Sequence, residues 1–347
     1  MDNNPAISPT IQKTLFYAVA NKASDIHLKT GQSPAIRING AIVGTELPVL
    51  TADEIGDFVG YMCPIEKENM NPLEACDFSW VYEGERFRCN VFNDNNGPCV
   101  SMRYLYLPTT DFGVLGIPEV LKKLADKKSG LILITGPTGS GKTTTLTCLI
   151  DHINKNYPLH IVMLEDPIEF IHKSNRSLIS QREIGVNARS YNSAIVEALR
   201  EDPDIILIGE MRDKDSIQGA LRAAETGHLV LSTLHTKGTA NSISRIIDIF
   251  PPEEQTNICM QLSMSLLGIV SQQLIPKADN TGRVLATEIM IANLPIQNLI
   301  RQQKLHMINS TLDLSSSDGM HTMKRSLEDL LMADMITRES YDNYQIC

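Results

Sequence analysis

The sequence predicts an α/β protein in which a larger domain, built on a mostly parallel sheet, follows a smaller α+β domain. In the second part of the chain four short apolar runs appear, at Leu131–Thr135, Ile161–Leu164, Ile205–Ile208 and Leu229–Leu234. Longer polar or helical stretches separate these runs, as expected for parallel strands that are covered on both faces. The first hundred residues instead alternate apolar and polar side chains around turn dipeptides, a pattern typical of antiparallel strands.

Length and composition fit two domains, each with a core of its own. The chain has 347 residues, of which 42% are hydrophobic and 21% charged, within the range of ordinary globular proteins. With 31 Lys and Arg against 41 Asp and Glu, the net charge is −10. Non-specific nucleic-acid binding needs a dense basic surface, so we expect no nucleic-acid partner.

No targeting or metal-binding pattern stands out. None of the seven cysteines forms a CxxC pair, so we expect reduced thiols rather than a zinc ribbon or a disulfide framework. The N-terminus lacks the basic and then apolar order of a secretory signal. The uncharged stretch Gln255–Pro276 repeats its apolar residues at helical spacing, which predicts a half-buried helix rather than a membrane span. We expect a cytoplasmic protein that meets a membrane only through partners.

In the smaller domain, two short runs surround Asn39-Gly40, a dipeptide that suits a type I′ hairpin turn. Thr51 and Glu54 have the spacing of a capping box, so a helix is expected from there towards Tyr61. A hairpin with its turn at Glu83-Gly84 is predicted over residues 77–92, and another strand over residues 100–107.

Turn and breaker residues between Pro108 and Pro118 interrupt the strand pattern and predict a linker. The expected organisation is therefore a first domain over residues 1–107, a hinge over residues 108–118, and a second domain with a C-terminal helical subregion over residues 119–347.

The strongest motif is Gly136–Thr143, which reads GPTGSGKT and matches G-x-x-x-x-G-K-[ST] at every fixed position. It follows one apolar run and precedes a helical stretch, which is the context that a phosphate-binding loop requires. Glycines let backbone N–H groups surround phosphates, and the helix N-terminus adds a favourable dipole. We predict an ATP site with Lys142 on the β- and γ-phosphates and Thr143 on Mg²⁺. The expected binding residues are Gly136, Pro137, Thr138, Gly139, Ser140, Gly141, Lys142, Thr143 and Thr144.

Hydrolysis also needs a carboxylate that positions water and holds magnesium. Two acids, Glu165 and Glu210, each follow an apolar run directly or within two residues, and open α/β sheets place ligands at the carboxyl ends of their strands. We predict Glu210 as a catalytic and metal-binding acid and Glu165 as a second catalytic acid. The sequence leaves open which of the two activates water.

Two histidines and two arginines complete the candidate site. His228 precedes a buried strand and His235 follows it, and a neutral imidazole there could bond the γ-phosphate or link the two acids. Arg200 and Arg245 are each a candidate arginine finger that acts on another subunit, or an exposed ion-pairing residue.

Together these segments resemble the PilT family of type IV pilus motors, within the secretion ATPase superfamily. The matching parts are the Walker A loop, an aspartate box at Glu165–Glu169, a Walker B segment at Ile205–Glu210 and a histidine box at Thr226–His235. Ala23–His27, which reads ASDIH, also resembles family sequence. The resemblance runs from about residue 11 to about residue 338.

The resemblance implies a PAS-like N-terminal domain, a RecA-like C-terminal domain and a homohexameric ring with ATP between subunits. In such a ring Arg200 and Arg245 match arginines that reach a neighbour's nucleotide. It also implies a motor that is peripheral at the inner membrane, acts on a pilus platform protein with the rest of the pilus machinery, and works in some systems beside a second motor ATPase.

The resemblance favours pilus retraction, because the long extra N-terminal domain and tetracysteine insertion of assembly motors are absent. Residues 294–302 resemble the retraction signature but carry Gln297 and Gln302 where that signature has Arg and Glu. This departure leaves open a PilU-like accessory, a specialised bundle-forming pilus motor or a conjugative-pilus relative. The same ATPase driving pilus assembly or secretion is a separate rival. A nucleic-acid translocase and a slowly hydrolysing scaffold are the alternatives from other classes.

Overall fold

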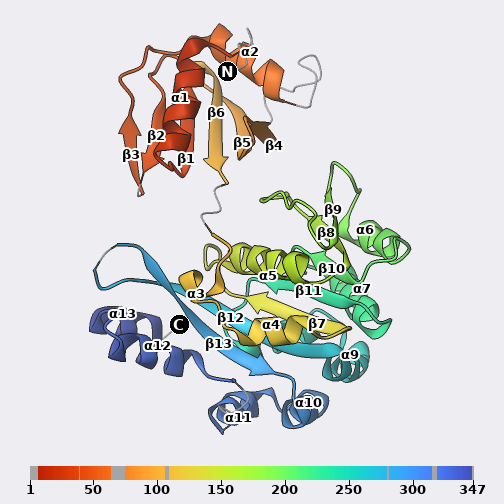
Figure 1. The fold of residues 1–347 in the computed structure, drawn as a ribbon. Coiled ribbons are helices and arrows are strands. Elements are labelled where there is room, and N and C mark those ends of the chain that lie inside the picture. Colours follow the sequence, from red (N-terminus) through yellow and green to blue (C-terminus); the bar gives the residue numbers. More distant parts are fainter. Residues whose placement is uncertain are drawn as a thin grey trace. The chain divides into compact units, whose positions relative to one another are not determined.

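The computed structural model describes residues 7–38, 40–63, 75–105, 109–279, 281–314 and 319–345. The chain forms two compact units, Met1–Pro108 and Thr109–Cys347 (Figure 1). Each unit is described by itself.

The first unit is an antiparallel sheet with helices on its apolar face. The sheet has the order β3-β2-β1-β6-β5-β4, and its apolar face packs against α1 (Pro9–Ala20) and α2 (Ala52–Met62). Its strands are β1 (Asp25–Lys29), β2 (Ala35–Ile38), β3 (Ala41–Gly44), β4 (Cys76–Tyr82), β5 (Glu85–Asp94) and β6 (Gly97–Tyr104).

Local sequence signals account for much of this unit. The Thr51 hydroxyl accepts a hydrogen bond from Glu54 N at 3.2 Å, and Glu54 Oε2 accepts one from Thr51 N at 2.9 Å, so the predicted capping box starts α2. The predicted β4–β5 hairpin turns at Glu83-Gly84, where both residues have positive φ. Of the predicted β2–β3 turn, Gly40 has φ +87°, and Asn39 lies outside the described residues. The sequence patterns did not predict α1 or β1.

The second unit is built on a seven-stranded sheet with the order β13-β12-β7-β11-β10-β8-β9. Every neighbouring pair is parallel except β12 and β13, which pair antiparallel at one edge. The strands are β7 (Gly130–Thr135), β8 (His160–Glu165), β9 (Leu178–Glu183), β10 (Ile205–Ile208), β11 (Leu229–Leu234), β12 (Leu266–Pro276) and β13 (Arg283–Ile291). The four apolar runs of the sequence are thus β7, β8, β10 and β11.

Helices cover both faces of this sheet, which explains why its central strands are apolar throughout. Leu131 and Leu133 of β7 face one core and Ile132 and Ile134 the other. The first core contains α6 (Tyr191–Ala198), α7 (Lys214–Glu225), α8 (Thr239–Asp248), α9 (Pro252–Ser265) and α10 (Leu294–Arg301). The second contains α3 (Phe112–Leu115), α4 (Val120–Ala125) and α5 (Lys142–Asn156).

The C-terminal helices follow α10 in the chain. They are α11 (Ile308–Leu314), α12 (Met323–Met332) and α13 (Arg338–Gln345). Leu327 of α12 and Tyr341 of α13 pack on Ile275 and Ala286 of the β12–β13 pair. Figure 1 shows these two helices, in dark blue, beside that pair of strands. The predicted C-terminal helical subregion is therefore anchored on the antiparallel edge of the sheet.

The segment predicted as a hinge belongs mostly to the second unit. Asp111 caps α3 by accepting from Val114 N at 2.9 Å, and Phe112 and Ile117 are buried in the core beside α5. Apolar burial therefore fixes residues 111–117 to the second unit, although their turn residues predicted a linker.

The predicted helix over Gln255–Pro276 is wrong in its second half. Helix α9 ends at Ser265, and Leu266–Pro276 forms β12, which pairs with β7 on one side and β13 on the other. Leu266 and Ile269 are buried in this strand, so their helical spacing was coincidental, and pairing in the sheet decided the conformation. Within the described residues no helix is both long and apolar enough to cross a bilayer.

Candidate active site

The phosphate-loop motif connects β7 to α5 at the carboxyl edge of the parallel strands. Gly136 has φ +144°, and a Cβ at this position would lie 2.4 Å from Gln272 O and 2.6 Å from Ser140 Oγ. Only glycine therefore fits where the loop leaves the strand. The loop ends at the N-terminus of α5, a helix of 15 residues, where backbone N–H groups and the helix dipole favour anions.

Lys142 is buried under this loop. Its Nζ donates hydrogen bonds to Gly136 O at 2.8 Å and to Pro137 O at 3.1 Å. Burial lowers the pKa of Lys142 because it disfavours the ammonium form, and the carboxylates of Glu210 and Glu169 oppose this effect. The cation is thus held in place by the loop itself, in the field of two acids.

The rest of the loop fits a phosphate ligand. Ser140 Oγ is buried and has no hydrogen-bond partner among the described residues, and such an atom normally finds one. Thr138 and Gly139 are exposed, while Thr143 and Thr144 at the start of α5 are half-buried. A hydroxyl donor, a buried ammonium and a helix N-terminus therefore meet at one loop, which is the arrangement that a polyphosphate requires.

Glu210 is linked to this loop through a histidine. It lies two residues after β10, and its Oε1 is 3.3 Å from His235 Nε2. His235 follows β11 directly, and its Nδ1 is 3.3 Å from Thr138 Oγ1 of the phosphate loop. Arg212 Nε donates to the other oxygen, Oε2, at 2.8 Å. The structure thus brings together three sequence-predicted residues, Thr138, His235 and Glu210, and adds Arg212.

Glu165 ends β8, next to the Glu210 segment, but has different partners. Its Oε1 accepts a hydrogen bond from Gln181 Nε2 of β9 at 2.9 Å. Tyr191, at the start of α6, shares this region: burial raises the pKa of its phenol, with smaller contributions from Asp166, Glu210 and Glu165. The two predicted acids therefore lie at neighbouring strand ends, and the half-buried Tyr191 accompanies them.

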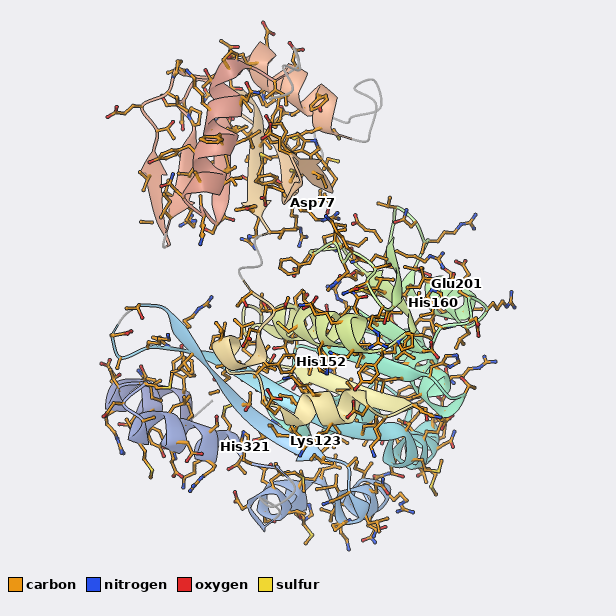
Figure 2. All side chains as sticks on the ribbon, in the orientation of Figure 1. Asp77, Lys123, His152, His160, Glu201 and His321 are labelled. Carbon is orange, nitrogen blue, oxygen red and sulfur yellow. The ribbon has the colours of Figure 1, made fainter. Side chains whose placement is uncertain are left out.

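Three predicted residues are not brought to the loop of their own chain. His228 comes just before Leu229, which aligns with Ile205 and with Ile161 of β8. His228 therefore lies at the amino edge of the sheet, the edge that also holds His160, which is labelled in Figure 2. A strand of six residues spans roughly 20 Å, so the prediction that His228 contacts this chain's nucleotide is wrong. Its Nδ1 instead lies 3.1 Å from Ala223 O of α7.

Arg200 and Arg245 are both exposed. Arg200 follows α6 and Arg245 is in the last turn of α8. Neither donates a hydrogen bond to the phosphate loop among the described residues, so the structure of one chain leaves both outside the site.

The sequence reasoning assigned no role to four side chains around the acids: Glu169, which lies in the aspartate box, Gln181, Tyr191 and Arg212. Arg212 had a signal, since it lies two residues after Glu210 in the Met-Arg-Asp segment. The segment that begins at Gln181 resembles family sequence, but its contact with Glu165 had no signal, because only the parallel pairing of β9 with β8 brings the two residues together.

Comparison with known proteins agrees with this geometry. The model of the type II/IV secretion system protein family matches residues 82–334. A protein of Pseudomonas aeruginosa described as the type IV pilus retraction ATPase PilT is 41% identical over 332 residues, which cover 95% of this chain and 96% of that protein. A twitching motility protein of Neisseria gonorrhoeae is 43% identical over 310 residues, 89% of this chain and 83% of the relative.

Solved structures agree as well. The crystal structure of the pilus retraction motor PilT with bound ADP superposes with a TM-score of 0.88 at 40% identity, and the match covers 96% of each chain. This similarity confirms the predicted α/β fold with its smaller antiparallel first unit. The phosphate loop and the acids at the neighbouring strand ends agree with these matches, which extend over nearly the whole chain. The chain therefore belongs to the type II/IV secretion system protein family, as an ATPase of the PilT type.

Proposed function

We propose that this protein is a homohexameric motor that hydrolyses ATP to power the retraction of type IV pili. The observation that carries the proposal is the connection Thr138–His235–Glu210, which joins the phosphate loop to a carboxylate within 3.3 Å at each step. Nucleotide binding alone needs no acid beside the phosphate loop, whereas hydrolysis needs a residue that positions the attacking water.

In this proposal Glu210 positions the attacking water and takes its proton. The water oxygen forms a bond to the γ-phosphorus, the bond from that phosphorus to the bridging oxygen breaks, and ADP and phosphate leave. Lys142 neutralises charge on the β- and γ-phosphates from its place under the loop. We assign the proton to Glu210 rather than Glu165 because Glu210 is coupled to the loop through His235, while Gln181 occupies one oxygen of Glu165.

The residues present also fit Mg²⁺. Thr143 and Glu210 would hold the ion, since a hydroxyl and a carboxylate are the hard oxygen donors that magnesium prefers. When bound, the ion offsets charge on the β- and γ-phosphates.

Assembly into a ring would complete the site. Arg200 and Arg245 are exposed and, within the part of the chain that the structure describes, form no hydrogen bond with their own phosphate loop, which supports a role at a neighbour's nucleotide. Closing and reopening around ATP would then move the first unit as a lever, with the pivot at the boundary between the two units. Peripheral attachment at the inner membrane would come through a platform protein and the pilus machinery, and a second motor ATPase would act beside this one.

Retraction is proposed over assembly because the relatives reported above, which match most of this chain, are described as retraction and twitching proteins. Deleting the gene tests the direction. A retraction motor predicts surplus surface pili that exert no pulling force, restored by the wild-type gene and not by a Lys142→Ala gene. Cells without pili would instead identify an assembly ATPase, and a phenotype seen only when a second motor is weakened would identify an accessory.

The purified protein tests the energy source and the ring. We expect magnesium-dependent ATPase activity and a particle mass of six chains. An Arg245→Ala or Arg200→Ala variant that stays hexameric should bind nucleotide and turn it over slowly. Full activity in a monomer would contradict the shared site.

A further inference from the structure

A buried carboxylate outside the phosphate site, Glu288 of β13, holds two helix starts at once. Glu288 is only 7% exposed. Oε1 accepts hydrogen bonds from Thr239 N at 2.6 Å and Thr239 Oγ1 at 2.9 Å, and Oε2 accepts from Met323 N at 3.3 Å. Thr239 is the first residue of α8 and Met323 the first of α12. The positive ends of two helix dipoles therefore stabilise this charge inside the protein.

The α8 start that Glu288 holds is the end of a short connection from the active site. Only residues 236–238 separate His235 from Thr239. Within this connection Gly238 N donates to Ser271 Oγ of β12 at 2.9 Å, and Gly238 O accepts from Ser242 Oγ at 2.7 Å. The connection is thus fixed at its far end by side chains of β12, β13 and α8.

At its near end the same connection carries the imidazole that faces the phosphate site. His235 Nδ1 and Nε2 each lie 3.3 Å from their partners, Thr138 Oγ1 and Glu210 Oε1. Contacts of this length lie at the edge of hydrogen-bonding range, so a small shift of the connection would break one of them.

We propose that Glu288 is a positioning residue for ATP hydrolysis, which fixes the start of α8 and thereby holds His235 between the phosphate loop and Glu210. The inference rests on the proposed role of His235. Because α8 begins four residues after His235, releasing Thr239 from Glu288 would free the imidazole to move without removing any group that touches nucleotide. A misplacement of about 1 Å near reacting groups can cost up to about 10²-fold in rate.

Glu288 also accepts a hydrogen bond from the start of α12. The loss of activity in a Glu288 variant could therefore pass through α8 or through α12, and a control must separate the two. The region around α12 is held independently: Thr322 Oγ1 accepts from Arg325 N at 3.4 Å, and His321, labelled in Figure 2, has Nε2 3.0 Å from Thr287 Oγ1. Thr322→Ala therefore weakens the start of α12 while leaving the Glu288–Thr239 contacts in place. It is the matched control for an effect that passes through α12 alone.

The experiment measures kcat and KM for ATP in Glu288→Ala, Glu288→Gln, Thr322→Ala, His235→Ala and the Glu288→Ala/His235→Ala double variant, with thermal melting as the folding check. We expect Glu288→Ala to lower kcat by about tenfold with KM within about twofold, since the phosphate loop is untouched. Glu288→Gln keeps an oxygen acceptor for Thr239, so it should recover most of kcat. Thr322→Ala should leave kcat near the wild-type value.

The double variant gives the decisive comparison. If Glu288 acts through His235, the double variant should turn over no more slowly than His235→Ala alone. The inference is overturned if the losses in kcat of the two single variants multiply in the double variant. It is also overturned if Thr322→Ala loses as much kcat as Glu288→Ala. Either result leaves the proposed role of His235 standing. Normal turnover in His235→Ala would refute the proposed role of His235 itself, and the inference with it. Should Glu288→Ala fail to fold, Thr239→Val removes one of the bonds to Oε1 and enters the same comparison.

Discussion

Replacing Glu210 with Gln removes one negative charge and one proton acceptor while keeping the size of the side chain. In the structure Glu210 has His235 at 3.3 Å and Arg212 at 2.8 Å, and His235 is the residue that joins it to Thr138 of the phosphate loop. We therefore expect Glu210→Gln to stop turnover and to leave nucleotide binding intact.

The magnitudes follow from these contacts. Loss of a positioned proton acceptor lowers a rate by about 10²–10⁴-fold, which corresponds to about 3–5 kcal/mol of activation free energy. Binding should change little, because Lys142 is held by the carbonyls of Gly136 and Pro137 and because the amide oxygen of Gln still offers Mg²⁺ an oxygen ligand. The variant also removes a negative charge near an anionic ligand, so the Kd for ATP should stay within about threefold or become lower.

The assay pairs steady-state ATP hydrolysis with a direct titration of nucleotide binding on the same preparation. Glu225→Gln is the matched control, since it makes the same charge change at the end of α7, where Glu225 accepts a hydrogen bond from Gln261. The reasoning is refuted if Glu210→Gln keeps more than about a third of wild-type turnover. It is also refuted if binding and turnover fall together.

Three further predictions concern the loop and its helix. Lys142→Ala should weaken ATP binding by about 10²-fold or more and abolish turnover, because it removes the buried cation; a nucleotide titration checks this against the exposed Lys155→Ala on the same helix. Gly136→Ala should cost at least about 2 kcal/mol of unfolding free energy, more than Gly139→Ala, whose Cβ would meet nothing within 4 Å; equal denaturation midpoints would contradict the steric argument. Burial raises the pKa of Cys148 to about 12, above its value in the unfolded chain, so the native state keeps this proton longer and stability is lost as pH rises from about 9 towards 12. At pH 10 the loss attributable to this thiol should be about 1 kcal/mol, measured as the difference in pH dependence between wild type and Cys148→Ala; parallel curves would show that the thiol is not responsible.

The sequence located the phosphate loop because every part of that motif is local. The strand, the glycines, the lysine and the helix follow one another within residues 130–156. Gly136, Gly139 and Gly141 each have a positive φ, which glycine adopts without strain. The acids Glu165 and Glu210 were found because the carboxyl ends of parallel strands share one edge. The same rule places His228 at the opposite edge, since it precedes β11, and applying it strictly would have excluded that residue from the site.

Other parts of the site are set by contacts distant in sequence. Gln181 reaches Glu165 only because β9 pairs with β8, and Glu288 reaches Thr239 across 49 residues. Neither hydrophobic periodicity nor residue spacing in the sequence predicts these two side-chain contacts.

Local pattern by itself determined the four apolar strands, the capping box of α2 and the loop that binds phosphate, because hydrophobic periodicity, caps and glycine conformations act over a few residues. The tertiary structure decided the conformation of segments whose long-range contacts oppose their local pattern. Residues 266–276 carry helical spacing but form β12, since a place between β7 and β13 satisfies their backbone hydrogen bonds and buries both faces. Residues 111–117 look like a linker but pack as part of the second unit, because Phe112 and Ile117 find an apolar core there.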